Sequence, residues 1–514
     1  MNFMNAMKNE LNKEKTYTEN GAVAYAISGK ELLDFSFETT ALRDASEPEI
    51  ENKFMGVYFE NPLVAMRYLF WLRDCRGGNG ERRIFRVCLK ALAKNKPSVA
   101  KVVLPLVSEY GRWDDLWCLL DTDLKDNVIR LVLKQLDADI SAVYNNQKIS
   151  LLGKWMPSEN TSSAETRRFA KILREGLGIS PKSYRKTLSL LRSYGNVVET
   201  YVSANNWSEI NYSAVPSQAN LRYKNAFMRH DMERRNAYLD SLVRGDAKIN
   251  AGVLQPHEIV AKYNPRSWWG GKVEVNNYDE TLEQLWKALP DVSVENAMVV
   301  RDGSGSMTCN RYGGAEPLAV ASALAIYIAE HNTGVWKDKF ITFSHKPKLI
   351  DLSNCKTLRD KLVETYAHDE CENTNIEATM DLVLQTAIAN HCTQDELPAR
   401  IIIVSDMAFD SATTTYEGWQ RNPVDESLFD GIARKFEDAG YLMPKIVFWN
   451  VNQGNVKGGI PMQQNKLGVV LMSGYSTQLM TMAMSGETDP YKVLLETISV
   501  ERYNPVEDAV KDVI

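Results

Sequence analysis

The chain has few cysteines and no long apolar run, and both features narrow the class of protein. Its seven cysteines, in 514 residues, are scattered, odd in number and never in Cys-x-x-Cys spacing. That pattern favours reduced thiols in a cytosol and argues against a disulfide framework and a zinc site. No run approaches the roughly 18 apolar residues that span a bilayer. The first residues also lack the basic and apolar regions of a signal peptide. We therefore expect a cytoplasmic protein without a membrane segment.

The composition is that of a folded protein with several domains. Hydrophobic residues make up 44% of the chain and charged residues 25%, which is typical of soluble globular proteins. A chain of this length is longer than a domain with a single hydrophobic core usually is. The net charge of -6 hides an asymmetry, because residues 1–290 carry +6 and the remainder carries -12. This asymmetry suggests a polyanion-binding part joined to an acidic part, although ordinary surface variation could also produce it.

Residues 20–290 carry helical patterns joined by short loops. In residues 62–73, for example, apolar side chains recur at helical spacing and Pro62 stands in the first turn. No β-alternating run of any length occurs in this half. Successive helices with short connections predict a stack of helix pairs, an α-solenoid of the HEAT kind. No strict sequence period supports the repeat.

Strands and helices alternate in the second half. The expected strands are 296–301, 338–343, 400–405, 444–450 and 467–472, and the expected helices are 316–332, 356–367, 375–390, 426–439 and 489–499. Such alternation predicts a parallel, doubly wound α/β sheet. We therefore expect two domains, an all-α helical-repeat domain over 1–290 and an α/β domain over 291–514.

Oxygen-bearing side chains follow the expected strands. Asp302, Ser304 and Ser306 come after the apolar run 297–300, and Asp406 comes after another, 401–404. Ligands of open α/β sheets bind at this carboxyl edge, and carboxylates with hydroxyls suit Mg²⁺ or another hard divalent cation. The pattern resembles the metal-ion-dependent adhesion site of von Willebrand factor A domains. That resemblance adds Thr374, although the Gly pair that often precedes this Thr is Glu372-Asn373 here. It also implies an open coordination position for an acidic group of a partner. The alternative is a vestigial site that holds no metal.

The densest basic stretch is 148–192, with ten Lys or Arg against three Glu. Arg167, Lys171 and Arg174 share one helix face, and Lys182, Arg185 and Lys186 line one side of the next helix. Two such faces would make a phosphate-binding strip. The candidate RNA-binding residues are Lys154, Arg167, Arg168, Lys171, Arg174, Lys182, Arg185, Lys186 and Arg192. A solvated charged face is the simpler alternative.

Three further groups allow more than one interpretation. Basic residues at 222–235 alternate with Tyr223 and Phe227, which could stack unpaired bases but fit an amphipathic core helix better. The turn 77–83 is glycine-rich and leads into a basic helix start that could take a phosphate, although a tight interhelical loop is simpler. Arg112, Asp114 and Asp115 are expected to hold a structural ion pair without a function.

Five segments resemble motifs of the TROVE-like family, which includes the Ro autoantigen: 17–22, 72–82, 110–116, 154–160 and 405–410. The resemblance covers nearly the whole chain. It implies a ring of HEAT-like helices followed by a von Willebrand factor A domain, in a cytoplasmic, non-catalytic protein. Such proteins bind small structured noncoding RNA on the outer surface and misfolded RNA through the ring. Here the metal site would serve an acidic protein partner.

Two other functions remain open. A metal-dependent protein-interaction scaffold would use the same cation site without RNA. An enzyme is disfavoured, because the sequence has no nucleophile–base pairing at telling spacing, no nucleotide loop and no Cys/His cluster. The Asp302 and Asp406 pair could in principle activate a metal-bound water.

Overall fold

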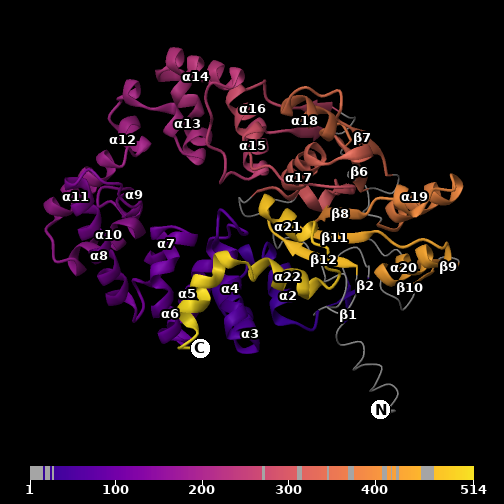
Figure 1. The fold of residues 1–514 in the computed structure, drawn as a ribbon, viewed down its shortest axis with the longest axis horizontal. Helices are drawn as coiled ribbons and strands as arrows, with labels where there is room; N and C mark the ends of the chain where they lie inside the picture. Colours follow the sequence, from indigo (N-terminus) through magenta and orange to yellow (C-terminus); the bar gives the residue numbers. More distant parts are fainter. Residues whose placement is uncertain are drawn as a thin grey trace. The chain divides into compact units, whose positions relative to one another are not determined.

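The computed structural model describes residues 15–17, 23–25, 28–268, 272–308, 315–343, 347–368, 376–407, 414–417, 420–423, 428–452 and 468–514. The chain divides into two compact units (Figure 1). The sheet unit comprises Met1–Ser46 with Leu254–Thr497, and the helical unit comprises Glu47–Val253 with Ile498–Ile514. The chain is thus helix-rich with one six-stranded sheet, as expected for a helical domain joined to an α/β domain.

The helical unit is described throughout, and no strand occurs in it. Its helices are α3 (Glu47–Glu60), α4 (Pro62–Arg73), α5 (Arg83–Asn95), α6 (Pro97–Val103), α7 (Val107–Tyr110), α8 (Lys125–Tyr144), α9 (Leu152–Trp155), α10 (Ala164–Gly176), α11 (Pro181–Tyr194), α12 (Val198–Ser203), α13 (Ser217–His230), α14 (Met232–Arg244) and α23 (Asn504–Val510), with the 3₁₀ helices η3 (Trp113–Leu119) and η10 (Glu501–Tyr503). Local chemistry sets several starts. Asn61 and Ser180 each accept a backbone N–H at an N-cap that precedes a proline.

Helices close in sequence pack together in this unit. Helix α3 contacts α4 and α5, α5 contacts α6, and α13 contacts α14. The longer helices bury a stripe of apolar side chains; on α4 the stripe includes Leu69, Phe70 and Leu72. Burial of such stripes between neighbouring helices is the main source of stability for short helices.

The sheet unit is built on six strands in the order β12-β11-β8-β5-β6-β7. They are β5 (Ala297–Asp302), β6 (Lys339–Phe343), β7 (Leu349–Asp351), β8 (Arg400–Ser405), β11 (Lys445–Asn450) and β12 (Val469–Ser473). The first five strands in this order are parallel, but β7 runs antiparallel to β6. The expectation of a wholly parallel sheet was therefore wrong at one edge. Five residues separate β6 from β7, too few for a crossover, so the chain must return antiparallel.

The strands and helices predicted in the second half otherwise match the structure. Strands β5 and β8 are buried almost end to end, as expected for apolar strands covered on both faces. Helix α17 (Pro317–His331) packs on β5, β6 and β8 and is buried from Pro317 to Ala329. The helices of this unit are α2 (Glu31–Phe37), α15 (Pro256–Tyr263), α16 (Glu280–Lys287), α17 (Pro317–His331), α18 (Leu358–Tyr366), α19 (Ile376–Ala389), α20 (Leu428–Asp438), α21 (Met480–Ala483) and α22 (Pro490–Ile498).

The structure also contains three short antiparallel strand pairs, two of which lie within residues 1–290, so the all-α prediction for that part is wrong at those places. They are β1 (Lys15–Tyr17) with β2 (Val23–Tyr25), β3 (Arg266–Trp268) with β4 (Lys272–Glu274), and β9 (Thr414–Glu417) with β10 (Gln420–Pro423).

The bounds of the two units differ from the predicted division at residue 290. Helix α15, before that residue, packs against α17, and α2 near the amino terminus packs against β12. At the other end of the chain, α23 packs against α4 and α6. Each of these short helices buries its apolar side chains on a partner far away in sequence, and a linear division of the chain cannot represent that.

Candidate metal centre and basic surface

The candidate metal centre lies where β5 and β8 end. The two strands are parallel neighbours, with Arg301 beside Val404, so Asp302 and Ser405 end their strands together. Asp406 follows directly. Three predicted ligands, Asp302, Ser304 and Asp406, are buried, and Ser306 is half-buried. The prediction that these loops meet at one edge rests on the parallel register, and the structure has that register.

Hydrogen bonds hold Asp302 in a fixed orientation. One carboxylate oxygen accepts the backbone N–H of Ser304 at 2.9 Å, and the other accepts the hydroxyl of Ser405 at 2.6 Å. The hydroxyls of Ser304 and Ser306 lie 3.0 Å apart. Carboxylate and hydroxyl oxygens therefore gather in one tight loop, the donor set that a hard divalent cation takes.

Burial makes this carboxylate costly to ionise. Asp302 is fully buried, and this burial raises its pKa, an effect only partly opposed by the hydrogen bonds from Ser405 and Ser304. Asp406 is 1% exposed at the end of the neighbouring strand. Two buried carboxylates at neighbouring strand ends are each costly to ionise. A divalent cation between them would remove that cost, so the residues present fit a metal.

Ser405 is a member of the site that the sequence interpretation missed. Besides donating to Asp302, its hydroxyl accepts the backbone N–H of Met407 at 3.0 Å. Met407 has a φ of 67°, a left-handed conformation that costs energy in a non-glycine residue and is common at functional sites. The signal was present in the sequence, since Ser405 directly precedes Asp406 at a strand end.

Thr374, the remaining predicted ligand, lies outside the described residues. Among those that the structure describes, no three His, Cys, Asp or Glu side chains gather as a metal-binding group. A cation at this edge would therefore depend on the serine hydroxyls as well as on the two aspartates.

The structure places the predicted RNA-binding residues on α9, α10 and α11, and most of them have partners. Arg168 pairs with Asp121, Lys154 lies 3.7 Å from Glu199, and Arg174 and Arg185 share Glu159 at 3.0 and 3.1 Å. Glu159 thus links α10 to α11.

Two further arginines of the strip bind backbone carbonyls. Arg192 donates to the carbonyls of Gly153 and Met156, and Arg167 donates to that of Ser162. These two side chains therefore stabilise loops. The three lysines, Lys171, Lys182 and Lys186, are exposed, and the described residues offer no carboxylate within ion-pair distance of them. They form the available cationic part of the strip.

The second basic group includes a structural arginine. Arg235 is fully buried, donates to Asn220 at 3.1 Å and lies against the rings of Tyr212 and Phe227. Phe227 is also fully buried. This supports the interpretation of residues 222–235 as an amphipathic core helix pair.

No helix in the described part of the chain is both long and apolar enough to cross a membrane.

Comparison with known proteins identifies two domain models and one relative. Residues 18–129 and 174–292 match a domain of unknown function (DUF2828), and residues 296–509 match another (DUF7788). An uncharacterized protein of Acanthamoeba polyphaga mimivirus is 30% identical over 96% of this chain and 88% of its own length. Among solved structures, the Ro (RSR) protein of Deinococcus radiodurans matches with 14% identity over 86% of this chain and 92% of that chain, at a TM-score of 0.35. The identity and coverage of the mimivirus protein show that this chain belongs to the same family.

Proposed function

We propose that this protein is a non-catalytic RNA-binding protein, Ro-like in its combination of a HEAT-like helical part with a von Willebrand factor A-like part. It would bind small structured or misfolded RNA through the helical unit. Mg²⁺ or another divalent cation, bound at the edge of the sheet, would coordinate an acidic group of a protein partner. The observation that carries the RNA part is the group of exposed lysines on α10 and α11, for which no carboxylate of the described residues forms an ion pair.

These lysines support phosphate contacts for a simple electrostatic reason. Lys182 and Lys186 are four residues apart on α11 and share its exposed side, and Lys171 stands on α10. Glu159 holds the two helices together through Arg174 and Arg185. Lysines on helices fixed in this way can follow a phosphate backbone without sequence preference.

The RNA proposal is tested by purifying the full chain from cells without nuclease and sequencing any RNA that comes with it. Reversing the charge of Lys171, Lys182 and Lys186 to Glu should weaken binding of that RNA at least about tenfold and flatten its salt dependence. Changing Lys101, Lys125 and Lys134 to Glu alters the net charge equally and should have little effect. Protein that carries no RNA and ignores added RNA at low salt would contradict the proposal.

The cation is the second part of the proposal. Asp302, Ser304, Ser306 and Asp406 would hold it, with Thr374 as the remaining expected ligand, and the bound ion would supply a position for a carboxylate. Mg²⁺ or Mn²⁺ should raise the melting temperature of the wild type but not of Asp302→Ala. Asp291→Ala, which removes an aspartate that is 95% exposed, should respond like the wild type. A wild type indifferent to both ions would contradict this part.

A second candidate function is a metal-dependent protein scaffold without RNA. The specific observation in its favour is that Asp121, Glu159 and Glu199 already form ion pairs with four of the nine strip residues. It predicts that Asp302→Ala abolishes partner capture while RNA is absent from the purified protein. Metal-dependent RNA cleavage that is lost in Asp406→Ala would instead establish an enzyme.

A further inference from the structure

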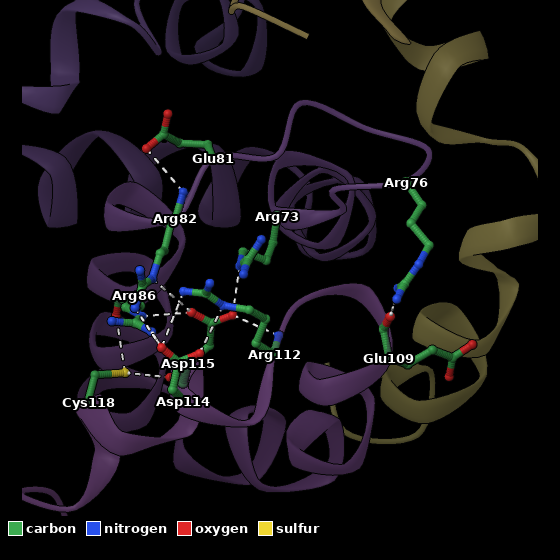
Figure 2. A network of polar contacts seen from close by, with 10 residues as sticks. All are labelled: Arg73, Arg76, Glu81, Arg82, Arg86, Glu109, Arg112, Asp114, Asp115 and Cys118. Atoms are coloured by element: carbon green, nitrogen blue, oxygen red, sulfur yellow. Dashed lines mark hydrogen bonds and ion pairs between the residues drawn. The ribbon is translucent and has the colours of Figure 1, made fainter. Parts of the chain in front are cut away.

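Two sequence segments without an assigned function meet in the helical unit. The glycine-rich loop after α4 leads into Arg82 and Arg86, and the start of η3 supplies Arg112, Asp114 and Asp115 (Figure 2). The side chain of Asp115 is fully buried and accepts from the Nε atoms of Arg73 and Arg86, each at 2.7 Å. The network they form is called the arginine cluster here: Arg73, Arg82, Arg86 and Arg112 with the two aspartates.

Every carboxylate oxygen in the arginine cluster lies within ion-pair distance of a guanidinium group. The Oδ2 of Asp114 meets Arg82 at 2.6 Å and Arg86 at 2.9 Å, and its Oδ1 meets Arg112 at 3.0 Å. The Oδ1 of Asp115 accepts from Arg86, and its Oδ2 accepts from Arg73 and from the backbone N–H of Arg112. The aspartates therefore satisfy only part of the donor capacity of four guanidinium groups, each of which has five N–H donors.

The charge of the cluster does not balance. Four guanidinium groups face two carboxylates, which leaves a surplus of two positive charges. Counting Glu81, which accepts the backbone N–H of Arg82 at 3.1 Å, still leaves one. Burial, followed by repulsion from Arg86, lowers the pKa of Arg82, and burial also lowers that of Arg112. Arginine stays protonated nonetheless, so the surplus remains as an unfavourable interaction that an anion would relieve.

The surplus charge is accessible to solvent. The side chain of Arg82 is 47% exposed, whereas those of Arg86 and Arg112 are 26% and 28% exposed. Arg112 is held in place because its guanidinium lies 4.1 Å from the ring centre of Trp155. Helix α5, which begins at Arg83, has no acidic residue in its first turn. Such a first turn would normally favour Asp or Glu, so the first turn itself adds no negative charge to that of Glu81 and Asp114.

The backbone is adapted to this arrangement. A Cβ atom on Gly111 would lie 2.6 Å from Asp115 Oδ2 and 2.9 Å from Arg73 Nε, and one on Gly78 would lie 2.0 Å from the carbonyl of Trp71. Glycine at these positions lets the loop and η3 approach closely enough for the cluster to form. The site is therefore preorganised, with Asp115 and Arg73 as its buried base and Arg82, Arg86 and Arg112 toward solvent.

We propose that Arg82, Arg86 and Arg112 form a binding site for a phosphate group. Guanidinium groups present paired N–H donors that match the oxygens of phosphate, and several of them around one anion give specificity for that chemistry. The phosphate could belong to an RNA backbone or to a free phosphate compound. The first source rests on the proposed RNA-binding function, whereas the second does not depend on it.

The test is calorimetric titration of the full-length protein with inorganic phosphate, in chloride buffer at constant ionic strength. Saturable binding is expected for the wild type, weakened about tenfold or more in Arg82→Gln, because this variant removes a charge-assisted hydrogen bond to the anion. Arg244→Gln is the matched control, since it removes an exposed arginine of the same unit that also pairs with an aspartate, at 2.8 Å. Arg112→Gln provides a second variant in case Arg82→Gln does not fold. The titration of the wild type tests phosphate binding independently of both variants.

Absence of saturable phosphate binding to the wild type would overturn the proposal. So would binding that Arg82→Gln and Arg112→Gln leave unchanged. A parallel titration with a single-stranded RNA distinguishes the source. Loss of both ligands in Arg82→Gln would assign the phosphate to RNA. If Arg82→Gln loses binding of inorganic phosphate while its RNA binding is unchanged, the ligand is a free phosphate compound. The same assignment follows if the wild type binds inorganic phosphate but no RNA, and it then stands even though the proposed RNA-binding function fails.

Discussion

At the residue scale, Asp34 offers a direct test of electrostatics in the sheet unit. Burial raises its pKa to about 6, although its carboxylate accepts the backbone N–H of Ser28 at 2.7 Å. A carboxyl whose pKa is higher in the folded than in the unfolded state favours folding when protonated. The sheet unit should therefore lose stability as the pH rises from about 4 through 6. Asp34→Asn should remove that loss and gain on the order of 1–2 kcal/mol at pH 7.

The measurement is urea unfolding of the wild type and Asp34→Asn at several pH values. A wild-type profile that stays flat between pH 4 and 6 would contradict the assignment. Asn can still accept the N–H of Ser28, so the variant changes the charge and little else.

A substitution at Gly111 tests whether the arginine cluster depends on the close approach of the backbone to Asp115 and Arg73. A methyl group there would push apart Asp115 and Arg73, a pair whose side chains are 0% and 4% exposed. Gly111→Ala should therefore destabilise the helical unit by about 3 kcal/mol, as expected when a buried ion pair is disrupted. Gly252→Ala is the control, because a Cβ there meets nothing within 4 Å. Equal denaturation midpoints for the two variants would show that the close approach is unimportant.

At the element scale, the carboxyl-terminal segment is an integral part of the helical unit. Arg502 donates through Nε and Nη2 to Asp74, whose side chain is fully buried, and the Tyr503 hydroxyl donates to the same carboxylate at 3.2 Å. The Tyr503 ring stacks on Tyr110 with centroids 5.6 Å apart. Helix α23, which follows these two residues, packs against α4 and α6 and so belongs to the core of the helical unit.

Arg502→Gln should cost the helical unit about 3 kcal/mol, because it leaves the buried Asp74 carboxylate without its countercharge. The loss should appear in thermal unfolding as a lower midpoint for this unit. Lys511→Gln, in the same segment, removes an exposed pair with Asp508 and should change stability by less than about 1 kcal/mol. Similar losses for both variants would mean that Asp74 does not need Arg502.

At the scale of the whole molecule, the two units should respond to different ligands. Each unit has its own buried core, so calorimetry should resolve two transitions. A ligand at one hundred times its dissociation constant adds about 2.7 kcal/mol to the unit that binds it. Mg²⁺ should therefore move the transition that Asp34→Asn alters, and phosphate the one that Gly111→Ala alters. One transition moved equally by both ligands would contradict this assignment.

The sequence by itself determined the features that depend on local residue patterns, namely the type of secondary structure and the ends of the strands. Hydrophobic period and turn residues were enough for the helical character of the first half and for the five parallel strands, because periodicity and capping act over a few residues. Parallel strand order then implied that Asp302, Ser304, Ser306 and Asp406 meet at one edge. Thr374 stays a prediction, as do the metal and the RNA.

Only the tertiary structure decided which side chains are available and which are already paired. It showed that Glu159 and Asp121 pair with arginines of the basic strip, and that Lys171, Lys182 and Lys186 are exposed with no ion pair to any described residue. It also placed α2 and α23 in units distant from them in sequence. Ion pairs and helix docking join residues separated by tens to hundreds of positions, and a local pattern carries no information about such pairings.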